Sequence, residues 1–418
     1  MIRSVRGLRW WIIGAVMLGT IVNYLTRSTL SVAAPTFMAD LKIDEQQYSW
    51  ITAAFQIGIM LQPVVGYILD VIGLRVGLAL FATGWGIFTV AHGFATNWQW
   101  LAAMRGLLGF AEGTSHTGGM KVASEWFPAK ERGFASGIYN LGASAGAALA
   151  APLVAGAIIL WDWRAAFYVA GGLALLWVAL WLFLYRPPQE HPSITRAELD
   201  HIEGGQEAEL APSGKRPSIP SILKQRNFWG IALPRFLADP TWGTLTFWMP
   251  LYLVSVRGFD LAQIAIFAFL PFVAADLGCM FGPALVLWLQ RRGIELIDAR
   301  RWTFTFGALL MTGMIFVGSV ESPYVAVALL CVGGFAHQTL SVTCITMSSD
   351  LFRRDEIGTV AGMAGTMANM GVLIFSLLIG GLVQTVGYNP FFIALGLLDI
   401  VAAVLLWTLV RKPGAATS

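Results

Sequence analysis

The chain has 418 residues, of which 56% are apolar and only 12% are charged, and its mean hydropathy is +0.67. Soluble domains contain about 45–50% apolar and about 25% charged residues, so this composition excludes ordinary water-soluble enzymes and predicts an integral membrane protein. The formal net charge is +3 and the basic residues are scattered, which argues against nucleic acid as a partner. Cys279, Cys331 and Cys344 lie in apolar segments without metal-ligand or disulfide spacing, so we expect buried thiols and no metal site.

Twelve apolar segments are long enough to cross a bilayer, which takes about 20 mostly apolar residues. The N-terminal sequence MIRSVRGLRWW leads into the first segment without a small-residue cleavage site. We therefore expect a retained first helix and not a removed signal peptide. In chain order the predicted spans are residues 10–36, 48–69, 76–95, 98–120, 132–158, 163–185, 228–255, 262–289, 302–319, 323–347, 358–385 and 389–410.

The distribution of basic residues supports this number of spans and orients them. With the N-terminus in the cytoplasm, 21 of the 27 Lys and Arg residues fall on the cytoplasmic side, three on the outer side and three within the membrane. Cytoplasmic loops of membrane proteins usually carry such an excess of basic residues. We therefore expect both termini in the cytoplasm.

A long polar stretch, residues 187–224, separates the sixth span from the seventh and is predicted to be a cytoplasmic loop with a short amphipathic helix. It divides the chain into two six-helix halves, residues 1–186 and 225–418. At an offset of 225 residues the chain matches itself at eight positions, among them Gly146 with Gly371. Parallel repeats of this kind occur in transporters whose halves move around a midplane site. The predicted fold is an all-α membrane protein of 12 transmembrane helices in two pseudo-symmetric six-helix bundles.

Three charged side chains of the first half are predicted at bilayer depth: Arg27 in the first span, and Arg105 and Glu112 in the fourth. Ionised groups at that depth cost at least about 2.5–3.5 kcal/mol each, so they usually face a partner or a functional site. Arg105 and Glu112 are seven residues apart, which places them on one helix face about 10 Å apart along the axis. We expect Glu112 to bind a proton under the influence of Arg105, and Arg27 to bind an anion through its planar guanidinium. Fixed ion pairs that only hold the bundle together are the alternative.

The second half has membrane-embedded charges of its own. Arg235 and Asp239, in the sequence PRFLADPTW, are spaced i, i+4 and are therefore within salt-bridge reach on one helix face. The neighbouring prolines should loosen that helix. Arg235 is an alternative to Arg27 as the anion-binding group, and a structural pair with Asp239 fits the sequence equally well. Asp239 and Asp276 are alternative proton carriers, whereas Asp399 is expected to be structural.

The loop after the second span reads GYILDVIGLR and resembles the signature loop of the major facilitator superfamily. The resemblance implies a conformational latch on the inner side, formed by Gly66, Asp70, Gly73 and Arg75. The match is partial, because Val71 and Leu74 stand where basic residues are frequent in the family. A simple tight turn is the alternative.

Longer segments resemble one branch of that superfamily, the anion:cation symporters. Residues 124–153, SEWFPAKERGFASGIYNLGASAGAALAAPL, look like its fourth-to-fifth-span region, and NYLTRSTLSVAAP and WRAAFYVAGG fit the same family. RNFWGIALPRFLADPTWGTLTFWMPLYL, GGFAHQTLS and SSDLF closely resemble the bacterial hexuronate transporters, which carry galacturonate and glucuronate with protons. This resemblance spans nearly the whole chain and implies a bacterial cytoplasmic (inner) membrane as its location.

The resemblance also implies roles for individual residues. The family's coupling carboxylate matches Glu112 and its substrate arginine matches Arg27, with Tyr24 beside it. Many relatives carry an aspartate where this chain has Thr26, which cannot titrate, so Glu112 alone is expected to carry one proton per sugar acid. A uronate also needs hydroxyl partners, and the candidates at bilayer depth are Gln56, Tyr139, Asn140, His337, Gln338, Ser341 and Asn369. Trp242 and Trp248 are candidates for an apolar stacking face.

The expected function is proton-coupled symport of hexuronates by alternating access, driven by the proton gradient without a bound cofactor. The expected partners are a small-molecule sugar acid, the proton and the lipid bilayer, and we expect a monomer. One alternative is the same mechanism with an aldonate, an aldarate or another organic anion as cargo, and another is a sensor that binds a sugar acid without transporting it. The sequence has no nucleophile–base arrangement, metal-ligand spacing or phosphate-binding loop that would indicate an enzyme.

Overall fold

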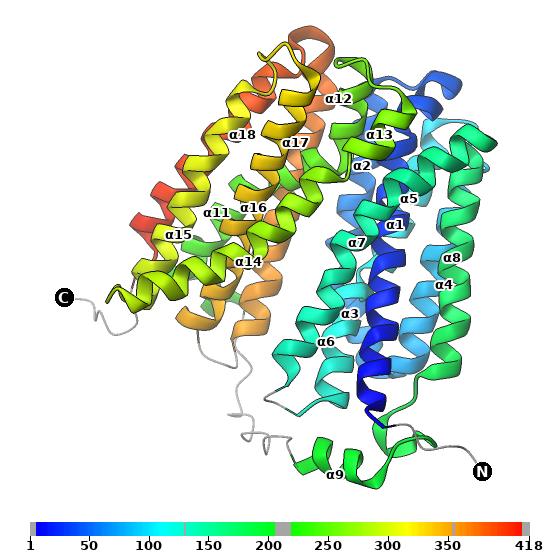
Figure 1. The fold of residues 1–418 in the computed structure, drawn as a ribbon, viewed down its shortest axis with the longest axis vertical. Coiled ribbons are helices and arrows are strands. Elements are labelled where there is room, and N and C mark those ends of the chain that lie inside the picture. Colours follow the sequence, from blue (N-terminus) through cyan, green and yellow to red (C-terminus); the bar gives the residue numbers. More distant parts are fainter. Residues whose placement is uncertain (1–5, 129–130, 205–218, 353–355, 412–418) are drawn as a thin grey trace. The chain divides into compact units, whose positions relative to one another are not determined.

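The computed structural model describes residues 6–128, 131–204, 219–352 and 356–411, and all regular secondary structure in these ranges is helical (Figure 1). The chain forms two compact units. The first comprises Met1–Ile43 and Ala54–Ala211, and the second comprises Asp44–Ala53 and Pro212–Ser418. Residues 44–53 group with the second unit although they lie early in the chain.

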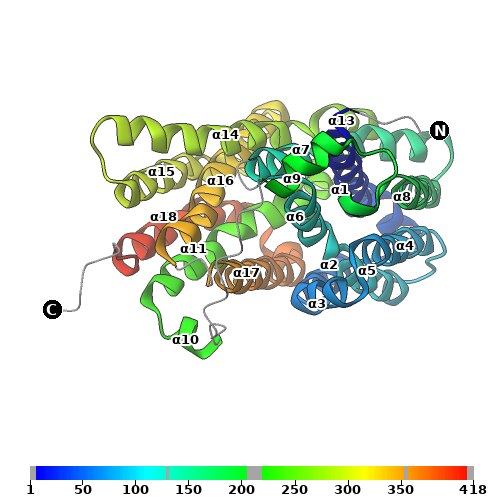
Figure 2. The same ribbon diagram turned by 90° about the horizontal axis from the view of Figure 1, so that it is seen from below.

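The helices of the first unit follow one another with short connections. Figure 2 shows them from their ends, with α1 close to α7 and α8, against which it packs. They are α1 (Leu8–Leu41), α2 (Glu45–Ile59), α3 (Gln62–Ile72), α4 (Leu74–His92), α5 (Trp98–Glu112), α6 (Thr114–Trp126), α7 (Arg132–Leu160), α8 (Trp163–Leu184), η1 (Pro188–Glu190) and α9 (Arg196–Gly204).

The second unit is built around α11, which packs against α16, α17 and α18. Figure 2 shows these helices gathered around it. The elements of this unit are α10 (Ile219–Leu223), α11 (Arg226–Gly243), η2 (Thr244–Trp248), α12 (Met249–Ser255), α13 (Leu261–Phe267), α14 (Leu270–Arg291), α15 (Leu296–Met311), η3 (Thr312–Phe316), α16 (Pro323–Leu351), α17 (Ile357–Val386) and α18 (Asn389–Leu409).

Eight helical stretches among the described residues are long and apolar enough to cross a membrane. The four other predicted spans, 48–69, 98–120, 228–255 and 302–319, are built from shorter helical pieces. In the span at 228–255, Pro234 and Pro240 both lie inside α11, which continues through them, and the irregularity comes later, as the π-helical turn η2 ahead of Pro250 near the start of α12. Proline has no backbone N–H to continue the regular ladder.

Side-chain caps set where two helices of the first unit, α5 and α8, begin. The Asn97 side chain accepts a hydrogen bond from the backbone N–H of Trp100 at 2.8 Å and starts α5. The Asp162 side chain accepts one from the N–H of Ala165 at 2.9 Å and starts α8. Such caps satisfy backbone donors that have no partner within the helix. The cap at Asn97 thereby fixes the register in which α5 presents its charged residues.

The internal repeat is visible in the packing of each unit. Gly146 on α7 lies against α1, where a Cβ atom would overlap the backbone carbonyl of Ile21. Its repeat partner Gly371 on α17 lies against α11, where a Cβ would overlap the carbonyl of Phe236. Small residues allow membrane helices to approach this closely. The match between Gly146 and Gly371 therefore reflects the same helix contact made once in each unit.

Replacing Gly371 with Ala is expected to destabilise the protein by about 1–3 kcal/mol, because the methyl group would press on backbone that cannot move aside. Gly362→Ala is the matched control on the same helix, since a Cβ there has no atom within 4 Å. Thermal unfolding in detergent should show a lower midpoint for Gly371→Ala than for the wild type. Equal midpoints for the two variants would contradict the close approach of α11 and α17.

The central loop contains the expected short helix, α9, which docks on the start of α1. The carboxylate of Glu198 accepts hydrogen bonds from the backbone N–H groups of Leu8 and Arg9, both at 3.1 Å, and is only 6% exposed. His201 lies 2.9 Å from Glu131. An acidic group at a helix N-terminus satisfies unpaired N–H donors and complements the helix dipole. This contact anchors the first part of the central loop to the first unit.

Candidate functional site

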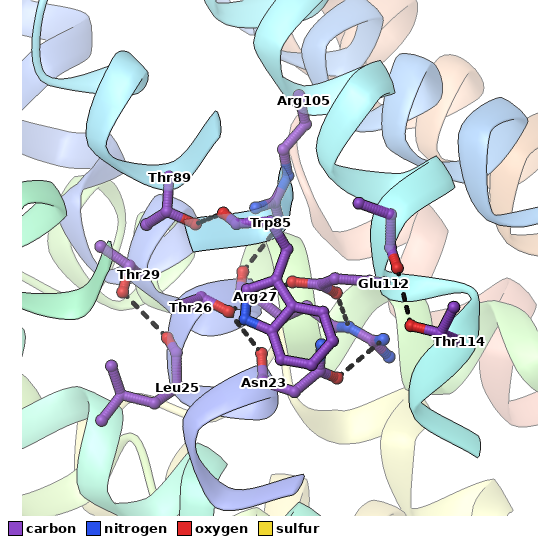
Figure 3. A network of polar contacts seen from close by, with 11 residues as sticks. Asn23, Leu25, Thr26, Arg27, Thr29, Trp85, Thr89, Arg105, Glu112 and Thr114 are labelled. Atoms are coloured by element: carbon purple, nitrogen blue, oxygen red, sulfur yellow. Dashed lines mark hydrogen bonds and ion pairs between the residues drawn. The ribbon is translucent and has the colours of Figure 1, made fainter. Parts of the chain in front are cut away.

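Arg27 and Glu112 form a buried ion pair between α1 and α5 (Figure 3). The Nε atom of Arg27 lies 2.9 Å from Oε2 of Glu112, and the hydroxyl of Thr26 lies 3.2 Å from Oε1. The Glu112 side chain has no exposed surface and that of Arg27 is 13% exposed. Both carboxylate oxygens therefore have a partner, as a buried charge requires.

Arg105 supports this pair from its other side. Its guanidinium donates a hydrogen bond to the backbone carbonyl of Arg27 at 2.7 Å and lies 4.5 Å from the centroid of the Phe55 ring. The residue is fully buried. Arg105 thus contacts the backbone of α1, the helix that carries Arg27. Arg105 therefore fixes the position from which the Arg27 side chain extends.

Small residues bring α2 and α5 together at this site. A Cβ on Gly58 would overlap the backbone carbonyl of Gly106, and a Cβ on Gly109 would overlap that of Phe55. The close crossing brings the Phe55 ring beside both arginines, with the guanidinium of Arg27 5.3 Å from its centroid. These aromatic contacts are favourable for cations.

The charges at this site favour an anion. Two guanidinium groups face one carboxylate, so the cluster has an excess positive charge when Glu112 is ionised and a larger one when it is protonated. Tyr24 lies beside the pair as expected, with its ring centroid 4.6 Å from the guanidinium of Arg27. Concentrated positive charge in a water-poor environment attracts anions strongly. The arrangement can therefore bind one carboxylate and one proton in close proximity.

A second charged cluster lies within the second unit. Arg235 and Asp239 on α11 form the predicted i, i+4 ion pair, with Nη2 of the arginine 3.2 Å from Oδ2 of the aspartate. His337 on α16 lies 3.8 Å from the other carboxylate oxygen. Trp242 stacks on the His337 imidazole with a centroid distance of 5.8 Å and an interplanar angle of 19°. Arg235 and Asp239 of α11 thus meet His337 of α16.

The other predicted binding residues are distributed over several helices. Asn369 on α17 donates a hydrogen bond to the carbonyl of Gly365 at 3.0 Å, and the Arg235 side chain lies near Gly365, which places Asn369 near the second cluster. Trp248 is buried and donates to the Ser376 hydroxyl at 2.9 Å. The side chain of Asn140 lies outside the described residues. Buried candidates are Gln56, Tyr139 and Ser341, and partly buried ones are Gln338, Asn369 and Asp276.

The predicted latch is described only in part. The surroundings of Gly66 and the side chain of Asp70 lie outside the described part of the structure. Gly73 ends α3 with a φ of +82°, a conformation that favours glycine. Arg75 donates to the backbone carbonyl of Leu182 at 2.7 Å. This bond ties the start of α4 to the end of α8 within the first unit.

The pairing of Arg27 with Glu112 could not be identified from the sequence. The two residues are 85 positions apart on different helices, and no periodicity within α1 or α5 indicates which charges of separate helices will meet. The only available signal was that each is ionisable and lies within an apolar segment.

Comparison with known proteins agrees with the fold and the membrane-spanning helices. The family profile described as Major Facilitator Superfamily matches residues 16–297 and 294–418. The Hexuronate transporter of Escherichia coli (strain K12) is 46% identical over 416 residues, which cover 99% of this chain and 96% of that protein. The Galacturonate transporter of Dickeya chrysanthemi is 46% identical over 78% of this chain and 95% of its own length.

A solved structure has the same fold despite low sequence identity. The bacterial homologue of the human lysosomal transporter Spinster superposes with a TM-score of 0.74 at 16% identity, covering 97% of this chain and 96% of its own. These relatives are transporters, and the chain is likewise a multi-pass membrane transporter and not an enzyme. The chain belongs to the Major Facilitator Superfamily.

Proposed function

We propose that this protein is a proton-coupled symporter that imports hexuronates, such as galacturonate and glucuronate, by alternating access. The observation that carries the proposal is the buried Arg27–Glu112 ion pair, because it joins a group suited to carboxylates with a group suited to protons. The choice of sugar acid is supported by the two 46%-identical relatives, which are named as hexuronate and galacturonate transporters.

The proposed coupling is a competition for Arg27. While Glu112 is ionised, its carboxylate occupies the Nε side of the guanidinium at 2.9 Å. Protonation of Glu112 neutralises this competitor and leaves the planar fork of Arg27 to bind the substrate carboxylate. Substrate and proton therefore favour each other's binding, as two ligands must when each removes an obstacle to the other.

Thr26 supports this exchange. Its hydroxyl lies 2.7 Å from the backbone carbonyl of Asn23 and 3.2 Å from Oε1 of Glu112. When the hydroxyl donates to Asn23, its oxygen remains an acceptor for the proton of a neutral Glu112. A threonine at this position can thus satisfy either protonation state of Glu112 without titrating itself.

The proposal includes the cellular setting and the energy source. The protein would lie in a bacterial inner membrane with both termini in the cytoplasm, as the excess of basic residues in the predicted inner loops supports. It would work as a monomer, without a bound cofactor, on the proton gradient. The lower proton concentration on the cytoplasmic side would favour release of the proton there.

Uptake of labelled galacturonate into proteoliposomes tests the proposed function. We expect an inward proton gradient to stimulate uptake and a protonophore to remove that stimulation. Uptake that ignores the gradient would contradict proton coupling. Binding without uptake would indicate a sensor. Absence of galacturonate uptake together with uptake of galactonate would change the cargo to an aldonate, the substrate class named for a relative in Escherichia coli O6:H1 that is 27% identical.

A further inference from the structure

Asp399, on α18 of the second unit, is a buried carboxyl without a partner in the described part of the chain. Its exposed fraction is 0%, and neither Oδ1 nor Oδ2 has a hydrogen-bond partner among the described residues. Native proteins rarely leave a buried polar side chain in this condition, and an isolated buried carboxylate is far more costly than a neutral acid. A purely structural role for Asp399 does not explain why a carboxyl stands at this position.

The acid that acts on Asp399 is Asp239 of the second charged cluster. The two helices that carry them pack together, and Ala238, next to Asp239, shares a core cluster with Ala402 and Ala403, about one turn beyond Asp399. Asp239 acts on Asp399 electrostatically through this contact. Two neighbouring carboxyl groups in a water-poor site cannot both be ionised at low cost.

The cationic groups near Asp239 and Asp399 are too few to neutralise two ionised carboxylates. Arg235 is paired with Asp239 at 3.2 Å, and His337 lies 3.8 Å from the same aspartate. The Cys344 thiol is near Arg235 and Asp239. The helices α17 and α15 also pack against α18. The first, α17, has no titratable side chain. The charged residues of the second, α15, lie at its start, where Arg301 donates to the carbonyl of Val410 beyond the end of α18.

We propose that Asp239 and Asp399 form a second proton-binding site, in which Asp399 carries one proton per transport cycle in addition to the proton on Glu112. This inference rests on the proposed function. While Arg235 neutralises Asp239, Asp399 stays neutral by holding a proton on one of its own oxygens. When this part of the protein opens to the cytoplasm, water and the Arg235 side chain can stabilise the ionised form, and the proton leaves to water. Only an O–H bond is broken and remade.

The position of Arg235 links this site to the cargo. Its Nη1 atom would lie 3.9 Å from a Cβ placed on Gly365 of α17, one turn from Asn369, a predicted partner of the sugar hydroxyls. A substrate bound there changes the field that Arg235 exerts on Asp239, and hence the proton affinity of the acid pair. Each unit would then hold one arginine and one proton carrier. Two protons and one monoanion would then move one net positive charge inward per cycle.

The proton-to-substrate ratio of reconstituted transport tests this inference directly. The membrane potential at which net galacturonate flux is zero is measured at fixed pH and galacturonate gradients, with the potential set by potassium and valinomycin. We expect two protons per galacturonate for the wild type and one for Asp399→Asn, whose uptake should respond to the pH gradient and no longer to the membrane potential. A ratio of one in the wild type, or of two in Asp399→Asn, would overturn the inference.

Further variants keep the test decisive if Asp399→Asn does not fold. Asp239→Asn releases Arg235 to neutralise Asp399 and should also reduce the ratio to one. Glu321→Gln changes an exposed acid of the second unit and is the control that should keep the ratio of two. Loss of one proton in Asp276→Asn, with both acid-pair variants at two, would overturn the inference. A wild type that transports galacturonate with one proton leaves the proposed function intact, whereas the absence of galacturonate transport would overturn both.

Discussion

Replacing Glu112 with Gln is expected to remove one of the two coupled protons and so sharply reduce gradient-driven accumulation of galacturonate, while leaving equilibrium exchange intact. Glutamine has the shape of the neutral acid, so it leaves Arg27 free for the substrate carboxylate but cannot take up or release a proton. The carboxylate it replaces is fully buried and 2.9 Å from Arg27. Accumulation should fall to the level that the one remaining proton per galacturonate can support, and labelled-substrate counterflow should remain within about threefold of the wild type.

Two comparisons make the result specific to Glu112. Glu203→Gln changes an exposed acid on α9 that contacts Gln189 at 3.3 Å, and accumulation should be unchanged. Proteoliposomes with equal amounts of folded protein, checked by thermal unfolding, separate a coupling defect from a loss of protein. Full gradient stimulation in Glu112→Gln would rule out this residue as the coupling site and direct attention to the acids of the second unit.

Replacing Arg27 with Gln is expected to weaken galacturonate binding by about 30-fold or more, since removing one partner of a buried charged pair costs about 2–5 kcal/mol. Arg27→Lys should recover only part of this loss, because an ammonium group keeps the charge but lacks the planar two-pronged donor set. Half-saturation of galacturonate exchange, measured in both variants, gives the two values. Exchange is the appropriate readout because it does not require net proton movement.

The control for Arg27 is an arginine at an exposed ion pair of the same unit. Arg164 lies 3.1 Å from Asp40, with side-chain exposures of 33% and 49%, and exposed pairs contribute only about 0–1 kcal/mol. Arg164→Gln should therefore leave exchange unchanged. If Arg27→Gln binds galacturonate normally and Arg235→Gln does not, the carboxylate-binding role belongs to Arg235, the alternative that the sequence left open.

Local chemistry made several structural features predictable. The i, i+4 pair of Arg235 and Asp239 forms because residues four apart on a helix share a face. The repeat contact of Gly146 and Gly371 was indicated by their alignment, since only glycine permits such close helix packing. Each of these features depends on a few neighbouring residues.

Other features depend on which helices meet. Arg105 was expected to act on Glu112 along α5, and in the structure it also donates to the backbone of Arg27 on α1. Asp399 was expected to be structural, yet it is buried without a hydrogen-bond partner in the described chain and lies beside the cluster of Arg235 and Asp239. The grouping of residues 44–53 with the second unit likewise has no local signal. These relations are set by packing between distant segments.

The sequence by itself determined the membrane class, the twofold repeat of six predicted helices and the residues that bear charge inside the apolar segments. These follow from hydropathy and local spacing, which act over one or two helical turns. Only the tertiary structure decided the partners of those charges: Arg27 for Glu112, the Arg27 backbone for Arg105, and Asp239 for Arg235 and His337. The physical reason is that a buried charge must be satisfied across helix contacts, and those contacts bring together residues that are far apart in the chain.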